Sequence, residues 1–249
     1  MRKFFIAVAA LASLFAVATV AQGNTVTSPL GQVQTMTASH SPNKAGKGTS
    51  LSINLAIDCP GKQCQAPPAP VGKASPVTKT VVRLPKGIKL GYKAFAKCNP
   101  ARLSARGVSG CPRKSKVGSG NLTADGRPVV ETPVQGSVTS FNGTYSGGKP
   151  RYLLYVIPEL SSPIVLVGAL RGRTLTIPVP LIPTLPDQPN ATLTKFFVKT
   201  GGKTKKGKRR INYIANPKKC KKSWKWTLDF TYENGERLSP SANARCRRR

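Results

Sequence analysis

The 249-residue sequence predicts an all-β protein: a single antiparallel β-sandwich, immunoglobulin-like or jelly-roll-like, that is stapled by disulfides and follows an N-terminal signal peptide. Three observations lead to this prediction. Two ten-residue segments alternate strictly between apolar and polar residues, which is typical of half-buried strands. Many further short apolar runs are separated by turn residues, and helical signals are few, which favours a sandwich or a barrel. Six cysteines fit a disulfide-stapled domain.

Residues 1–23 have the pattern of a secretory signal peptide. Two basic residues follow the initiator Met, Phe4–Val20 is apolar or small throughout, and Ala21 suits the cleavage rule for small residues. The alternative is an uncleaved membrane anchor, but an apolar stretch of this length is marginal for a span that needs about 20 residues. We therefore expect cleavage near Ala21 and one secreted or cell-surface domain, residues 24–249.

All six cysteines follow this leader, and an even number in an exported chain implies disulfides. Of the possible pairings, sequence proximity favours Cys59–Cys64, Cys98–Cys111 and Cys220–Cys246. Loop entropy predicts roughly 3–4 kcal/mol of stabilisation from the last pair and about 2 kcal/mol from the first. A zinc site is disfavoured because only Cys59 and Cys64 have a ligand-like spacing. We expect no metal and no other cofactor.

The two clearest strands are Thr49–Asp58 and Ser223–Tyr232. In the first, the alternating apolar side chains are Leu51, Ile53, Leu55 and Ile57. In the second, they form an aromatic-rich stripe of Trp224, Trp226, Leu228, Phe230 and Tyr232. Such a stripe either stacks on sugars or bases or fills a core, and we expect it to fill the core.

Nine more strands are expected between turn residues: Gln32–Ser39, Val77–Leu84, Lys116–Ala124, Val134–Phe141, Arg151–Ile157, Ile164–Leu170, Arg173–Val179, Thr192–Lys199 and Arg210–Ala215. One short helix is expected, capped by Asn99 and running from Pro100 to about Arg106. Ile177–Pro186 is apolar with four prolines. It is either a partner-docking ridge or a connection over a sheet edge, and we expect the connection.

Charge is the feature that most suggests a partner. The chain has 40 Lys and Arg against 8 Asp and Glu, a formal net charge of +32, and Lys195–Lys225 holds thirteen basic residues and no acid. The candidate polyanion-binding residues are Lys203, Lys205, Lys206, Lys208, Arg209, Arg210, Lys218, Lys219, Lys221, Lys222, Arg247 and Arg248. The first six are expected at a hairpin tip, and a Cys220–Cys246 bond would hold the others side by side.

Such a basic surface attracts polyanions through counterion release. The candidates outside a cell are wall polymers, acidic glycans, anionic lipid head groups and released nucleic acid. Base-specific reading is not predicted, because no nucleic-acid motif occurs and no aromatic residues are interleaved with the basic run. The alternative is a solubilising surface without a specific partner. No small-molecule substrate is evident from the sequence.

The inventory of side chains disfavours catalysis. A Ser–His–Asp triad would have to use His40, which is expected in a loop beside the N-terminal strand, and no nucleophile elbow occurs. The carboxylates available for a glycosidase pair are Asp125, Glu131, Glu159, Asp187, Asp229, Glu233 and Glu236. We expect them to pair locally with Lys and Arg, and we expect no enzymatic activity. An extracellular hydrolase is kept only as a contrasting hypothesis.

Eight segments resemble, in order and spacing, a family of uncharacterised secreted β-rich proteins and repeat modules common in actinobacteria: Val82–Leu90, Ala96–Ala101, Cys111–Gly120, Gln135–Val138, Arg151–Tyr155, Leu185–Pro189, Asn216–Cys220 and Trp224–Gly235. The third has the form CPxxSxVGxG. The resemblance implies an extracellular β-sandwich with Cys98–Cys111 and Cys220–Cys246 pairs and no assigned catalytic residues. The chain differs from the family in its excess of Lys and Arg and in its extra Cys59 and Cys64.

The function expected from the sequence is therefore that of a non-enzymatic secreted or cell-surface protein with a structural or adhesive role. The second hypothesis is an extracellular polyanion-binding module that acts through the clustered Lys and Arg. Oligomeric state and ligand are not predicted.

Overall fold

The structure, a computed structural model, describes residues 22–248. Of the predicted leader, residues 1–21 lie outside the described residues, whereas Gln22 and Gly23 begin the first strand. The strands are β1 (Gln22–Thr27), β2 (Val33–Ser41), β3 (Gly48–Asp58), β4 (Val77–Arg83), β5 (Lys89–Leu90), β6 (Lys116–Gly126), β7 (Val130–Asn142), β8 (Arg151–Pro158), β9 (Ile164–Arg171), β10 (Thr174–Pro178), β11 (Thr192–Thr200), β12 (Lys203–Lys206), β13 (Arg209–Asn212), β14 (Ile214–Ala215), β15 (Ser223–Tyr232), β16 (Arg237–Leu238) and β17 (Ser241–Arg245). The helices are α1 (Pro100–Arg106) and the 3₁₀ turns η1 (Gly107–Gly110) and η2 (Arg113–Ser115).

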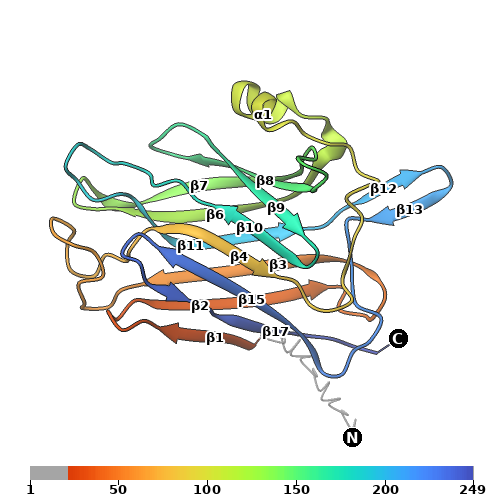
Figure 1. Cartoon of the computed structure of the whole chain (residues 1–249), viewed down its shortest axis with the longest axis horizontal. Helices are drawn as coiled ribbons and strands as arrows, with labels where there is room; N and C mark the ends of the chain where they lie inside the picture. Colours follow the sequence, from red (N-terminus) through yellow and green to blue (C-terminus); the bar gives the residue numbers. More distant parts are fainter. Residues whose placement is uncertain (1–21, 249) are drawn as a thin grey trace, which may run out of the picture.

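Twelve of these strands form a closed antiparallel β-barrel. Their order around the barrel is β11, β6, β7, β8, β9, β10, β4, β15, β17, β1, β2 and β3. The barrel closes because β3 pairs with β2 on one side and with β11 on the other, where Leu55 lies opposite Phe196. In Figure 1 the strands run along the long axis of the molecule, α1 lies outside the barrel, and the β12–β13 hairpin projects beyond one end.

The predicted two-sheet sandwich is therefore wrong, although the prediction of an all-β chain is confirmed. The eleven expected strands are all present within a few residues of their predicted bounds, with Arg210–Ala215 divided between β13 and β14. Two barrel strands, β1 and β17, were not predicted. They lie side by side between β15 and β2, so they join what would otherwise be two sheet edges. Neither strand has a stripe of large apolar residues that would indicate it.

The predicted short helix is confirmed. Asn99 caps α1, and its side-chain oxygen accepts a hydrogen bond from the backbone nitrogen of Ala101 at 2.8 Å. The helix covers the outer face of β7, β8 and β9 through a small apolar cluster that includes Leu103, Phe141 and Leu153. The Cys98–Cys111 disulfide belongs to the same cluster.

The other two disulfides also join the cysteines that sequence proximity favours, Cys59 with Cys64 and Cys220 with Cys246. Three disulfides indicate a chain that matures in an oxidising environment. The part of the chain that the structure describes contains no helix long and apolar enough to cross a membrane.

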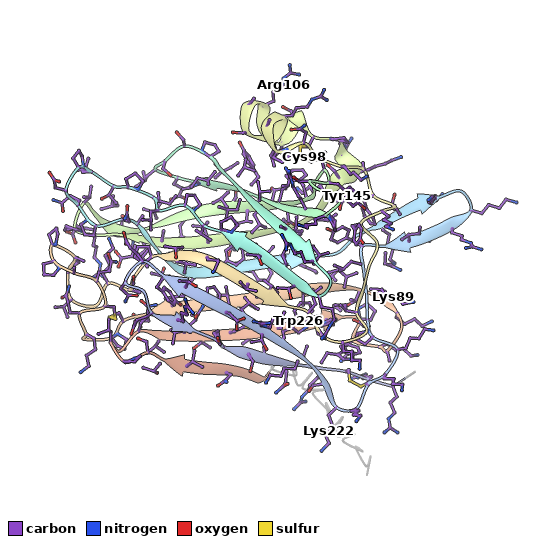
Figure 2. All side chains as sticks on the ribbon, in the orientation of Figure 1. Lys89, Cys98, Arg106, Tyr145, Lys222 and Trp226 are labelled. Carbon is purple, nitrogen blue, oxygen red and sulfur yellow. A yellow bond between two sulfur atoms is a disulfide. The ribbon has the colours of Figure 1, made fainter. Side chains whose placement is uncertain are left out.

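β1, β2 and β17 do not line the cavity described below, and the side chains of β15 and β17 alternate in size where the two strands pair. On β15, Trp226 lies opposite Ala242 of β17, and Trp224 lies opposite Ala244. Each large indole therefore has a small neighbour across the strand pair. Both tryptophans are buried, which confirms that the aromatic stripe is core (Trp226 is labelled in Figure 2).

Candidate functional site

The twelve predicted polyanion-binding residues all lie at one end of the barrel and are exposed. Lys203, Lys205, Lys206, Lys208, Arg209 and Arg210 belong to the β12–β13 hairpin, which forms its own two-stranded sheet. Among the described residues the ion pairs are Arg83–Asp229 and Arg127–Asp125, so no acid neutralises this cluster. We call this end the basic end.

Two connections hold the other six basic residues together. The Cys220–Cys246 disulfide joins the segment of Lys218–Lys222 to the C-terminal segment. The C-terminal segment is also bound to the β2–β3 turn. The backbones of Lys44 and Arg247 form an isolated parallel β-bridge, and the backbone nitrogen of Ala45 donates to the carbonyl of Arg247 at 2.9 Å. The expected juxtaposition of these clusters is confirmed. Figure 2 shows Lys89 and Lys222 at this same end.

His40 lies inside β2 and is buried, so the predicted loop position is wrong. Its Nδ1 is 2.6 Å from Oδ1 of Asn216, and its Nε2 accepts a hydrogen bond from Nε1 of Trp226 at 3.0 Å. Burial lowers the pKa of His40 below its ordinary value of 6.5, against the opposing effect of Asn216. Both ring nitrogens are thus engaged by Asn216 and Trp226 rather than by the acid and the Ser of a triad.

Most carboxylates lie at the opposite end of the barrel. Asp229 is the exception, since it lies within β15 and pairs with Arg83, the last residue of β4, at 2.7 Å. The other seven acids are found at the strand ends and turns of the end away from the basic end: Asp58, Asp125, Glu131, Glu159, Asp187, Glu233 and Glu236. Within residues 22–248, the expected pairing with basic residues is confirmed for Asp125 and Asp229 and not for the other acids.

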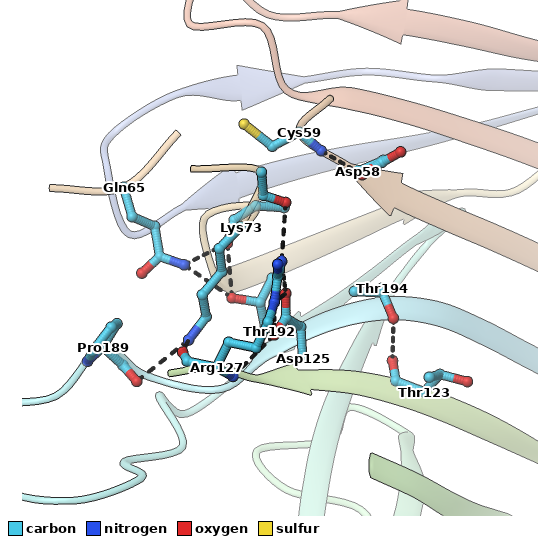
Figure 3. A network of polar contacts seen from close by, with 12 residues as sticks. Asp58, Cys59, Gln65, Lys73, Thr123, Asp125, Arg127, Pro189, Thr192 and Thr194 are labelled. Carbon is cyan, nitrogen blue, oxygen red and sulfur yellow. Dashed lines mark hydrogen bonds and ion pairs between the residues drawn. The ribbon is translucent and has the colours of Figure 1, made fainter. Parts of the chain in front are cut away.

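A buried polar network fastens the loops at this acidic end (Figure 3). Lys73 has no exposed surface, and its ammonium donates to the carbonyl of Arg127 at 2.6 Å. Arg127 pairs with Asp125 at 2.6 Å. Burial would raise the pKa of Asp125, but the hydrogen bonds and charge of Arg127, together with the charge of Lys73, outweigh it and lower the pKa. Burial lowers the pKa of Lys73, and Asp125 opposes that shift.

A large apolar cavity occupies the barrel interior. Its volume is about 460 Å³, within the range of small-molecule sites. Nine of the twelve barrel strands line it, all except β1, β2 and β17. The walls are mainly Leu, Ile, Val, Phe and Pro side chains, and among the residues that the structure describes Arg151 is the one charged residue that borders the cavity.

The cavity opens at the acidic end, which we call the mouth. Leu160, in the β8–β9 loop, lines the cavity and is also 65% exposed to solvent. Val129 lines it from the β6–β7 turn, and Ile182 from the β10–β11 connection. Eight large apolar side chains are exposed among residues 22–248, and all but Val108 lie at this end: Leu30, Val71, Val129, Ile157, Leu160, Leu181 and Leu185.

The basic end of the barrel is closed by the chain between β4 and β6. Asn142 of β7 is buried, and its side-chain amide donates to the carbonyls of Tyr92, Phe95 and Ala96 at 3.0–3.3 Å. Phe95 packs edge-on against Tyr213 with the ring centres 5.1 Å apart. This crossing segment therefore forms the floor of the cavity.

Sequence reasoning missed this cavity. The signal present in the sequence was the proline-rich run Ile177–Pro186, which does not lie over a sheet edge as expected. It leaves β10 and passes the mouth, where Val179, Ile182 and Pro183 line the cavity. Exposed leucines in three separate loops were a second signal. Comparison of the chain with family models, curated proteins and solved structures finds no match.

Proposed function

We propose that this protein is a non-enzymatic binding protein that holds an apolar molecule, such as the hydrocarbon part of a lipid, inside its barrel. The observation that carries the proposal is the cavity of about 460 Å³ with apolar walls on nine strands. Water inside a cavity with apolar walls finds few hydrogen-bond partners, so such a cavity favours an apolar occupant. No geometry favours the structural or adhesive role expected from the sequence.

The energetics of packing support an occupied cavity. Apolar side chains that line a cavity of about 460 Å³ lack the dispersion contacts that a filled core would give them. An apolar ligand that fills the space restores these contacts and removes apolar surface from water.

The test is binding of a fluorescent long-chain alkyl probe to the purified protein, followed by displacement with unlabelled lipids. Ala124 lines the cavity from β6, so Ala124→Phe places a ring in the ligand's space. We expect this variant to bind the probe at least about fivefold more weakly, in line with an overpacking cost of about 1–3 kcal/mol.

The matched control is Ala56→Phe. Ala56 lies on β3 next to the lining residue Leu55, but on the other face of the strand, where it is exposed. This variant should bind the probe like the wild type. Equal probe affinity of the wild type, Ala124→Phe and Ala56→Phe proteins would refute binding inside the barrel.

A polyanion-binding role for the basic end is the second candidate, as expected from the sequence. It is favoured by the six exposed basic residues of the β12–β13 hairpin and by the six others that the Cys220–Cys246 disulfide gathers beside them. Replacement of Lys205, Lys206, Lys208, Arg209 and Arg210 by Gln should lower retention on immobilised heparin and flatten its salt dependence. Unchanged retention across a salt gradient would remove this hairpin from the site.

We further propose that the chain is exported with its leader cut after Ala21. Gln22 is the first residue of β1, so such a cut leaves this barrel strand complete. N-terminal sequencing of protein recovered from the culture medium should read Gln22 first. Protein retained in cells with an intact N-terminus would contradict export.

A further inference from the structure

Hydroxyl groups gather at the floor of the cavity, where the walls are otherwise apolar. Tyr152 of β8, Thr200 at the end of β11 and Tyr213 before β14 all line the cavity there. The hydroxyls of Tyr152 and Thr200 are 2.6 Å apart and hydrogen-bonded. The mouth, at the far end of the same cavity, is lined mainly by apolar side chains such as Leu160, Ile182 and Val129. Ser161 and Thr184 also line it there, and the Thr184 hydroxyl donates to the carbonyl of Pro189 at 3.0 Å.

These hydroxyls have unused hydrogen-bonding capacity. The Tyr213 ring is buried, yet its hydroxyl forms no side-chain hydrogen bond with any residue that the structure describes. Polar groups inside proteins are normally hydrogen-bonded. A polar group of a ligand at the floor would supply a partner to the hydroxyl that lines the cavity, that of Tyr213.

The hydroxyl groups of the floor are uncharged. Burial raises the pKa of Tyr213, and the nearby Tyr152 and Tyr145 raise it further. Burial also raises the pKa of Tyr152, against the opposing hydrogen bonds of Ser140 and Thr200. Both phenols are therefore neutral hydrogen-bond donors at physiological pH. Arg151 borders the cavity, but alternation along β8 puts it on the same face as Leu153, which packs outside the barrel in the cluster under α1.

We propose that the ligand is an uncharged lipid with one terminal hydrogen-bonding group, such as a long-chain or polycyclic alcohol, and that this group binds at Tyr213, Tyr152 and Thr200. The apolar body then extends along the barrel toward the mouth. A charged head group is excluded from the floor because it would lose its hydration without gaining an opposite charge. This assignment rests on the proposed apolar-ligand function and specifies its ligand class and orientation.

The experiment compares four probes of equal chain length: a primary alcohol, the alkane, the fatty acid and the alkylamine. Each is measured by displacement of the fluorescent alkyl probe at neutral pH. We expect the alcohol to bind more tightly than the alkane, and the acid and the amine to bind more weakly than the alcohol.

Tyr213→Phe removes one cavity hydroxyl and keeps the ring. It should weaken alcohol binding about three- to tenfold, the worth of one hydrogen bond, and leave alkane binding unchanged. The matched control is Tyr145→Phe, because Tyr145 is near Tyr213 but does not line the cavity. It should leave both affinities unchanged.

The outcomes separate the two proposals. If no probe binds, the apolar-ligand function itself fails. If alkane and alcohol bind equally well, and Tyr213→Phe changes neither, the function stands and the oriented binding of a head group is refuted. Tightest binding of the fatty acid, lost in Arg151→Gln, would overturn the neutral ligand class in favour of an anionic one.

Discussion

At the residue scale, the single histidine shows how burial converts a reactive residue type into a structural one. His40 receives the indole hydrogen bond of Trp226 on Nε2, so that nitrogen must be unprotonated, and Nδ1 carries the proton toward Asn216. Asn216 in turn donates to the carbonyls of Pro42 and Lys44, both at 2.9 Å. The neutral ring thereby connects β2, β15 and the β2–β3 turn.

The first prediction concerns pH. The pKa of His40 is lowered by burial, so below pH 6.5 the unfolded chain takes up a proton that the folded chain does not. Stability should therefore fall as pH decreases from about 7 to 5, by at most about 1.4 kcal/mol per pH unit. Melting temperatures of the wild type and His40→Gln, taken across this window, check it. The variant should melt lower at pH 7 but vary less with pH; parallel curves would contradict the assignment.

The second prediction concerns the buried network at the mouth. Asp125→Asn removes the charge that balances Arg127 and Lys73, so it should destabilise the protein by about 2 kcal/mol, the scale of a hydrogen bond to a charged group. The control is Asp187→Asn in an exposed connection at the same end, where we expect a change within about 0.5 kcal/mol. Urea unfolding measures both, and equal midpoints for the two variants would argue against the network.

At the scale of elements, the Cys220–Cys246 disulfide fastens the start of β15 to the end of β17, where Ser223 lies opposite Arg245. β17 is short, and its inward side chains are the small Ala242 and Ala244. It therefore contributes little apolar burial of its own, and the covalent bond keeps it in the barrel.

The third prediction follows from this dependence. Replacing both Cys220 and Cys246 by Ser should destabilise the protein by about 3–4 kcal/mol on the loop-entropy relation. Unfolding in denaturant at constant oxidation state measures the loss. The Cys59–Cys64 disulfide closes a much shorter loop, so replacing both of its cysteines by Ser should destabilise the protein less. A larger loss of stability from this pair than from Cys220 and Cys246 would contradict the loop-entropy account.

At the scale of the whole molecule, the two ends of the barrel differ in chemistry. The mouth has most of the exposed large apolar side chains and seven of the eight acids, whereas the basic end has the twelve clustered Lys and Arg. A polyanion attracted to the basic end would leave the mouth free. The two proposed binding activities are therefore spatially separate.

The fourth prediction tests this separation. Saturating heparin should change the affinity for the alkyl probe by less than about twofold. The floor of the cavity lies between the two surfaces, and interactions between exposed charges are largely screened beyond about 8 Å at physiological salt. Probe titrations with and without heparin at fixed salt measure it. Direct competition between heparin and the probe would mean that both bind at one surface.

Alternation of apolar and polar residues predicted the strands, because a side chain's face depends only on its position along a strand. It could not separate a sandwich from a barrel, since both architectures have the same alternation. The difference depends on β1 and β17, which are polar or small in sequence and acquire their place through pairing. The disulfides followed from sequence proximity because each closes a local loop.

By itself the sequence predicted most of the strands, the capped helix and the clustered positive charge, and it favoured the correct disulfide partners; all of these are properties of local segments. Only the tertiary structure decided that the sheet closes, that His40 is a neutral core residue and that an apolar cavity ends in hydroxyl groups. Those features arise where residues distant in the chain meet, as Tyr152 meets Thr200. Whether apolar side chains fill the interior or leave room depends on the circumference of the closed barrel, and no segment alone contains that information.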